Sequence, residues 1–129
     1  MSILAPFFRF FPRTRGEEQH VKLRIIMKTG AATWTLAGNS SFVKSIAYTA
    51  TGKYLVTLTK AFPYLVSAQA SVLLDGAPSD ATTVNIFDAD WAAGTFNLAA
   101  MINDAPGVLA ANDEIHVDLH FAANSASFA

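Results

Sequence analysis

Residues 42–59 read FVKSIAYTATGKYLVTLT, and this stretch decides the fold. Two runs rich in aromatic and β-branched residues, 42–48 and 53–59, lie on either side of a short segment with one glycine. Aromatic and β-branched side chains favour strands, and glycine adopts the backbone conformations that a tight reversal needs. The stretch therefore predicts two antiparallel strands joined by a hairpin across Ala50-Thr51-Gly52-Lys53.

Similar runs recur on both sides of this hairpin. Val21, Leu23, Ile25 and Met27 lie at every second position, which is the pattern of a half-buried strand. Further strands are expected at 67–74, 82–87, 95–99 and 114–122. Short strands separated by Gly, Pro, Asn and Asp predict an all-β fold, an antiparallel sandwich or a barrel. The best helical candidate, 98–102, is too short to form a stable helix.

Two connections carry residues that are typical of turns. In Asn103-Asp104-Ala105-Pro106-Gly107, we expect Pro106 at the first central position of a turn and Gly107 with positive φ. In Asp88-Ala89-Asp90, we expect a turn in which the two carboxylates accept hydrogen bonds from local backbone.

The composition indicates a subunit that associates with neighbours. The chain has 129 residues, enough for one domain, of which 52% are hydrophobic and 15% charged, against roughly 25% charged in an average soluble domain. A chain so poor in charge has difficulty covering its own surface, which favours an oligomer. No apolar run reaches the ~20 residues of a membrane span, so no membrane partner is expected. The absence of cysteine excludes disulfides and thiolate metal sites.

The charges are distributed unevenly along the chain. Residues 1–60 contain all nine Lys and Arg and carry a net charge of +7, whereas residues 61–129 carry −8. Such asymmetry indicates either pairing of the two halves or an anionic partner for the first half. We favour pairing, because no nucleic-acid-binding motif surrounds the only cluster of basic residues.

That basic cluster belongs to an unusual N-terminus, in which four phenylalanines stand beside three arginines between two prolines, Pro6 and Pro12. An arginine interrupts the apolar run where a signal peptide would need continuity. We expect residues 1–20 to form an extended arm and residues 21–129 the sandwich domain, because proline disfavours helix in the residue before it. The arm is expected to be buried against another chain, with partner-binding residues Phe7, Phe8, Arg9, Phe10, Phe11, Arg13 and Arg15.

One strand carries candidate metal ligands. In a strand over 114–122, His116, Asp118 and His120 share one face. Imidazole and carboxylate both bind zinc, but residues four apart on a strand lie too far from each other to bind one ion together. A further ligand would have to come from His20 or from an acid elsewhere. We therefore predict no metal or other cofactor, and keep these three residues as the candidates of the alternative. No catalytic motif accompanies them, so we do not expect an enzyme.

Several segments together resemble small structural proteins of tailed bacteriophages. They are the run TGKYLVTLTKAFPYL (51–65) with SAQASV (67–72) after it, GTFNL (94–98), and DEIHVDLHF (113–121). The resemblance implies a virion protein with a jelly-roll type of β-sandwich, assembled as a homotrimer, that decorates or cements a capsid. Its expected partner is the major capsid protein, and its expected location is the capsid surface after assembly in the host cytoplasm. The resemblance carries over no catalytic residues.

Two other functions remain open at this point. A receptor- or glycan-binding module of a tail or head fibre would use exposed aromatic side chains, although we expect most of these to be buried; the candidates are Trp34, Trp91, Tyr48, Tyr54 and Tyr64. A small metal-dependent enzyme would be built around the three residues of the 114–122 strand.

Overall fold

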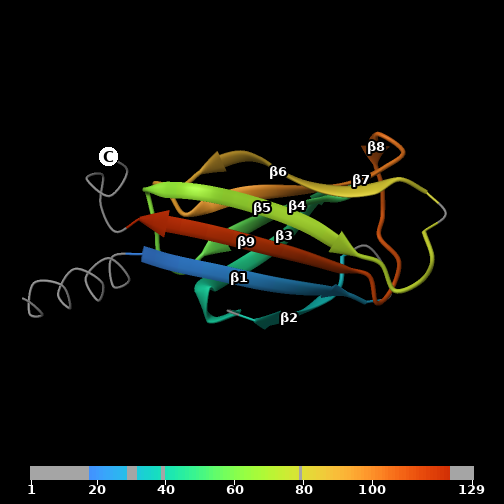
Figure 1. Cartoon of the computed structure of the whole chain (residues 1–129), viewed down its shortest axis with the longest axis horizontal. Coiled ribbons are helices and arrows are strands. Elements are labelled where there is room, and N and C mark those ends of the chain that lie inside the picture. Colours follow the sequence, from blue (N-terminus) through green and yellow to red (C-terminus); the bar gives the residue numbers. More distant parts are fainter. Residues whose placement is uncertain (1–17, 29–31, 39, 79, 123–129) are drawn as a thin grey trace, which may run out of the picture.

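The computed structural model describes residues 18–28, 32–38, 40–78 and 80–122. These residues form two antiparallel β-sheets packed face to face, with one short 3-10 segment at Ser40–Phe42 (Figure 1). The predicted all-β sandwich is confirmed. Residues 1–17 of the predicted arm, which include Phe7 to Arg15, lie outside the described residues.

The first sheet, called sheet A here, has four strands in the order β2-β1-β9-β5. Their bounds are Trp34–Gly38 for β2, Glu18–Met27 for β1, Glu114–Ala122 for β9 and Leu65–Leu73 for β5. The N-terminal strand β1 and the last strand β9 are therefore neighbours at the centre of this sheet (Figure 1).

The second sheet, called sheet B, has the order β3-β4-β7-β6, and a short strand β8 also pairs with β7. The bounds are Val43–Ala50 for β3, Lys53–Leu58 for β4, Thr95–Ile102 for β7, Thr82–Asp90 for β6 and Ala105–Pro106 for β8. The strand order keeps the hairpins β1–β2, β3–β4 and β6–β7 within single sheets. The jelly-roll type of sandwich, which the resemblance implies, stays a prediction.

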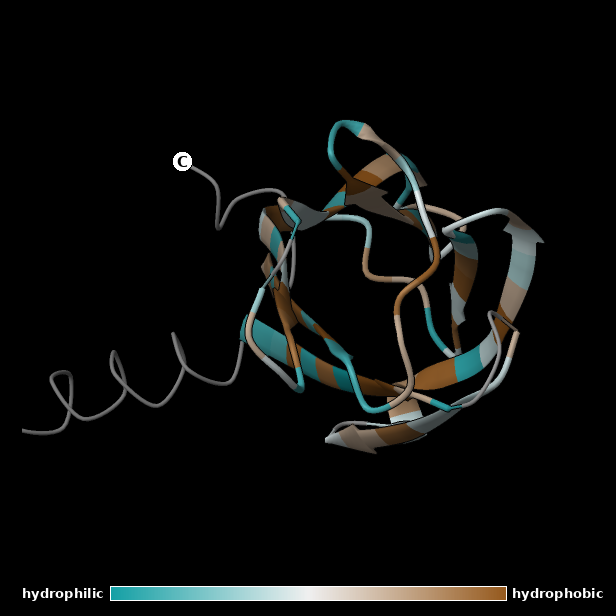
Figure 2. Cartoon of the chain, turned by 90° about the vertical axis from the view of Figure 1, so that its right-hand side faces the viewer, coloured by the Kyte–Doolittle hydropathy of each residue, from teal (hydrophilic) through white to brown (hydrophobic). Residues whose placement is uncertain are grey.

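The core lies between the sheets and is made by alternate residues of their central strands. The strands curve around this interior, with apolar bands along them (Figure 2). The largest fully buried side chains come from both sheets: Phe96, Phe121, Met27, Leu98, Ile115, Leu119, Val21 and Val56. Full burial of such a side chain contributes about 1.5–3 kcal/mol before ordering costs, so the period-two pattern fixes which face of each strand points inward.

The hairpin predicted from the opening stretch is confirmed. Ala50 pairs with Lys53 across a two-residue turn. Gly52 has φ +70°, and a Cβ there would lie 2.5 Å from the Gly107 carbonyl oxygen and 2.8 Å from that of Ala100. Glycine is therefore required both by the backbone conformation and by the close approach of the next loop.

The turn predicted at Pro106-Gly107 is wrong. The reversal occurs three residues earlier, at Asn103 and Asp104, which have φ values of 52° and 67°, whereas Pro106 lies in β8. Ile102 pairs with Ala105 across this two-residue turn. Two consecutive positive φ values match the twist of a hairpin, and Asn and Asp tolerate them better than most residues.

The segment Asp88-Ala89-Asp90 is a bulge near the end of β6 and not a turn. The pairing register shifts between Phe87 and Asp90, and Asp88 has φ 49°. The turn follows at 91–94, where Asp90 Oδ1 accepts a hydrogen bond of 3.2 Å from the Ala93 N–H. The expected capping by a carboxylate is thus present for Asp90.

Two further differences concern sheet A. Strand β1 begins at Glu18, so residues 18–20 pair with β9 and are not part of an arm that extends to residue 20. Strand β2 was not predicted, because its alternation is short and its threonine and glycine are also typical of loops. Within the described residues, no helix is long and apolar enough to cross a membrane.

Candidate functional site

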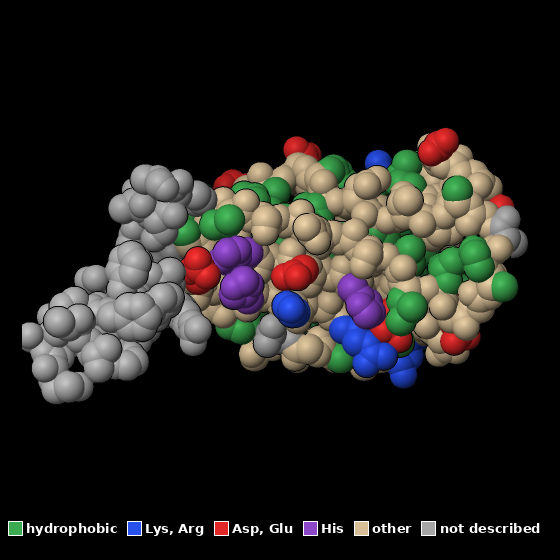
Figure 3. All heavy atoms as spheres, in the orientation of Figure 1, with side chains coloured by type: hydrophobic (Ala, Val, Ile, Leu, Met, Phe, Trp, Pro, Cys, Tyr) green, Lys and Arg blue, Asp and Glu red, His purple; other side chains and the backbone are tan. Residues whose placement is uncertain are grey.

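The outer face of sheet A, called the polar face here, carries the chain's histidines and many of its charges. It is formed by the residues that alternate with the core positions of β1, β9 and β5. Acidic, basic and histidine side chains follow β1 and β9 on this side of the molecule (Figure 3). Its main polar members are Glu18, His20, Lys22, Arg24, Glu114, His116, Asp118, His120, Gln69 and Ser71.

The register between β1 and β9 decides which of these side chains meet. His20 lies directly opposite His120, Lys22 opposite Asp118 and Arg24 opposite His116. Directly opposed side chains have Cβ atoms about 4.5–5.5 Å apart, close enough to interact. Basic residues of the first half of the chain thus meet acidic residues of the second half, as the charge asymmetry predicted for pairing of the halves.

One cluster on the polar face is a charge network around Glu114. The Arg24 guanidinium donates two hydrogen bonds to the Glu114 carboxylate, from Nε to Oε1 at 2.5 Å and from Nη2 to Oε2 at 2.8 Å. His116 Nε2 lies 2.9 Å from Glu114 Oε1. The hydrogen bond from Arg24, with that from His116 second, lowers the pKa of Glu114 from 4.5 to about 2, and the same pair raises the pKa of Arg24. This bidentate pair links β1 to β9.

The second cluster lies at the other end of these two strands and contains Glu18, His20 and His120. The two imidazole rings are stacked, with centroids 4.1 Å apart and planes 13° from parallel. Glu18 Oε2 lies 3.3 Å from His120 Nε2 and 3.9 Å from His20 Nε2. One donor atom from each of the three side chains lies within 4.8 Å of the other two.

The predicted ligand set of His116, Asp118 and His120 is not brought together. His116 is engaged with Glu114, and among the described residues only the Glu18, His20 and His120 group has three donor atoms in metal-binding proximity. His20 was foreseen as a possible additional ligand, but Glu18 was missed. Glu18 and His20 are two residues apart at the start of β1, so the strand pattern places them on one face. Their position opposite His120 depends on the register of β1 with β9, which the sequence does not reveal.

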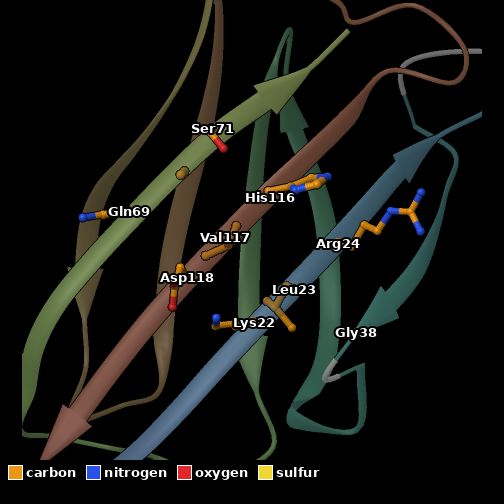
Figure 4. Close-up of a pocket in the computed structure, with 10 residues that line it drawn as sticks. Lys22, Leu23, Arg24, Gly38, Gln69, Ser71, His116, Val117 and Asp118 are labelled. Atoms are coloured by element: carbon orange, nitrogen blue, oxygen red, sulfur yellow. The ribbon is translucent and has the colours of Figure 1, made fainter. Parts of the chain in front are cut away.

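An open groove of about 370 Å³ lies on this face and reaches the Glu114 cluster, because Arg24 and His116 also line it. Its polar side chains come from β1, β9 and β5 and include Lys22, Asp118, Gln69 and Ser71, with Leu23 and Val117 also lining it (Figure 4). Both signs of charge are present in the groove, so it does not select an anionic or a cationic ligand by net charge.

The aromatic residues considered for glycan binding pack mostly against the core. Tyr54 is buried, Trp34 packs edge-to-face on it at 5.5 Å, and Trp91 stacks on Phe96 at 5.4 Å. Tyr48 is 38% exposed. The described residues therefore do not present these side chains together as a stacking platform for sugars.

The outer face of sheet B, called the low-charge face here, differs from the polar face. Its outward positions follow from the register of β3, β4, β7 and β6 around the buried residues. Two of these fourteen positions, Lys53 and Asp90, are charged; the others are Ser45, Ala47, Ala50, Leu55, Thr57, Thr83, Asn85, Phe87, Thr95, Asn97, Ala99 and Met101. The Lys53 ammonium lies 5.9 Å from the centre of the Phe87 ring. Asp90 lies at the end of β6, and the charged residues Lys44 and Asp88 lie at bulges, where the register shifts.

The site and fold thus define an all-β sandwich with one polar face and one low-charge face. Comparisons with protein-family models, with curated proteins and with solved structures found no match for this chain.

Proposed function

We propose that this protein is a non-enzymatic structural subunit of a virion, a capsid decoration or cement protein. The observation that carries the proposal is the low-charge face of sheet B, where fourteen outward positions include two charges, Lys53 and Asp90 at strand ends. An antiparallel sheet that meets water on its outer side usually alternates apolar and polar residues along each strand. On this face leucine, methionine, phenylalanine and alanine lie among serine, threonine and asparagine, and such a weakly charged mixture is suited to contact with protein.

The occupant that we propose for the low-charge face is a second copy of this chain, in a homotrimer. Because the face carries almost no charge, two copies can approach without like-charge repulsion. Its centre is made of small and medium side chains on β4 and β7, with Leu55 paired to Asn97 and Ala99 only 7% exposed, so the surface offers few long side chains that association would have to order.

Attachment to the shell is assigned to the N-terminal arm and the subunit edges, with the major capsid protein as partner. Support comes from the sequence of the arm and from the resemblance to phage structural proteins. Four phenylalanine side chains would contribute about 6–12 kcal/mol on full burial, before ordering costs. The three arginines would fix the register of the arm on an acidic partner surface. β1 starts at Glu18, directly after the arm, at one end of the central strand pair of sheet A.

The attachment is tested by deleting residues 1–16 and measuring co-sedimentation with shells of the major capsid protein. We expect the truncated chain to keep its far-ultraviolet circular dichroism spectrum and to lose shell binding. The matched control is the full chain with Arg9, Arg13 and Arg15 replaced by lysine, which keeps the charge and should keep most of the binding. If the truncated and folded chain saturates shells as the full chain does, the arm has no role in attachment.

A glycan-binding function stays an alternative. It has less support than assembly, because Trp34 and Trp91 pack against the core.

A further inference from the structure

We propose that Glu18, His20 and His120 form a binding site for a divalent transition-metal ion of the zinc type. The three side chains come from the two central strands of sheet A and meet at the end where β1 begins. Two imidazoles and one carboxylate are three of the ligand types that zinc prefers, and three protein ligands leave a fourth position for water. The inference does not depend on the proposed role in the virion.

The first argument is distance. Zinc with bonds of about 2.0–2.1 Å in a tetrahedral arrangement places its ligand atoms about 3.4 Å from one another. Glu18 Oε2 is 3.3 Å from His120 Nε2 and 3.9 Å from His20 Nε2, both within about half an ångström of that separation. The backbone register already holds the two histidines opposite each other, so only side-chain torsions have to change on binding.

The second argument is an incomplete hydrogen-bond arrangement. The Nε2 atom of His120 is buried, and among the described residues it has no hydrogen-bond partner. Glu18 Oε2 lies 3.3 Å from it, but this contact lacks hydrogen-bond geometry. A buried polar atom without a hydrogen bond is costly, and a metal ion would satisfy both this nitrogen and the carboxylate.

The third argument concerns the movement that binding requires. The lone pair of an imidazole nitrogen lies in the ring plane, and the two rings are stacked nearly parallel. One ring must therefore turn for both nitrogens to point at the same ion. The His20 side chain is 54% exposed and can turn without disturbing the core, whereas that of His120 is 23% exposed and serves as the fixed ligand.

The surroundings distinguish this cluster from the other imidazole on the same face. His116 is held by Glu114, which Arg24 binds in a bidentate manner, so a cation there would have to compete with a guanidinium. Next to the proposed site, Lys22 lies opposite Asp118, and this pair adds no net charge. The soft-to-borderline ligand set also disfavours magnesium, which prefers oxygen ligands in octahedral geometry.

Because the chain contains three histidines, nuclear magnetic resonance can assign the site directly. The full chain, freed of metal with a chelator, is titrated with zinc chloride while the ring nitrogens of all three histidines are observed. We expect resonances of His20 and His120 to shift and saturate at one zinc per chain, with those of His116 unchanged. Shifts confined to His116, or no saturable shift at all, would overturn the proposal.

Variants then test the two histidine ligands by isothermal titration calorimetry. We expect His20→Gln and His120→Gln to weaken zinc binding at least ~100-fold, since loss of a ligand should cost no less than loss of a residue that only orients one. The matched control, His116→Gln on the same face of β9, should bind zinc as the unchanged chain does. Magnesium chloride should give no binding. Equal zinc affinity in His120→Gln and in the control would refute the site, and the titration of the unchanged chain keeps the test valid if a variant does not fold.

Discussion

The two outer faces of the sandwich rest on one core and differ in almost every other respect. The polar face of sheet A bears acidic, basic and imidazole side chains in opposed pairs, and the low-charge face of sheet B bears two charges among fourteen positions. Inward positions are constrained by the core, whereas outward positions are constrained only by what they meet. We propose from this difference that the polar face of sheet A meets water and the low-charge face of sheet B meets protein.

This comparison also explains the low charge of the whole chain. Opposed pairs such as Lys22 with Asp118 use charges of both halves on a single face. Little charge is left for sheet B apart from its strand ends. The composition and the asymmetry between the two halves of the sequence are thus linked through the pairing of β1 with β9.

The largest expected effect is a loss of folding stability on substitution of Gly52, in the β3–β4 hairpin at the edge of the low-charge face. Gly52→Ala should lower the free energy of unfolding by about 2–5 kcal/mol, since it adds strain at positive φ to an overlap with two carbonyl oxygens. Urea denaturation followed by circular dichroism measures the change. Gly76→Ala is the control, because a Cβ at that position meets nothing within 4 Å, and its effect should stay within about 0.5 kcal/mol. Similar midpoints for both variants would show that the close approach of the Gly107 loop to the hairpin is not as described.

A smaller effect is expected on the polar face, where the contribution of Glu114 to folding stability should depend on pH. The pKa of Glu114 is lowered to about 2 in the folded chain from an ordinary 4.5, so its carboxylate stabilises the fold above pH 4.5. As pH falls from 4.5 to about 2, the unfolded chain takes up a proton that the folded chain resists, and this stabilisation is lost. Glu114→Gln should therefore be less stable than the unchanged chain at pH 6, and the difference should shrink toward zero near pH 2.

Thermal unfolding of both chains at a series of pH values measures this difference in stability. The other acidic groups are the same in both chains, so their contributions cancel. Ser71→Ala removes an uncharged side chain from the same face, so its stability should vary with pH as that of the unchanged chain does. A stability difference for Glu114→Gln that does not vary between pH 6 and pH 2 would contradict the assigned role of the Arg24 pair.

The fold could be predicted from local patterns because each strand carries its own signal. The hairpin at Ala50–Lys53 and the strand at 114–122 follow from period two and turn chemistry over fewer than twenty residues. The turn within 103–107 was misplaced because Pro-Gly is the stronger turn signal in the sequence. The actual turn, at Asn103 and Asp104, leads into β8, which has only two residues and carries no strand pattern of its own.

The candidate site could be predicted only in part, because it depends on contacts between residues far apart in the chain. The face shared by His116 and His120 follows from the strand pattern, but the partners of the two histidines do not. His116 meets Arg24 and Glu114, and His120 meets His20, because β1 and β9 pair in one particular register across about a hundred residues. A shift of one residue would have placed the same side chains in the core.

The measurement that tests the central claim most directly is the mass of the chain in solution by size-exclusion chromatography with light scattering. The unchanged chain is compared with Leu55→Asp, at the centre of the low-charge face, and with Ser71→Asp, on the polar face opposite His116. Our account predicts an oligomer, a trimer, for the unchanged chain and for Ser71→Asp, and a monomer of about 13.8 kDa for Leu55→Asp. A monomeric unchanged chain, or an oligomer that Leu55→Asp leaves intact, would contradict the assignment of the low-charge face to assembly.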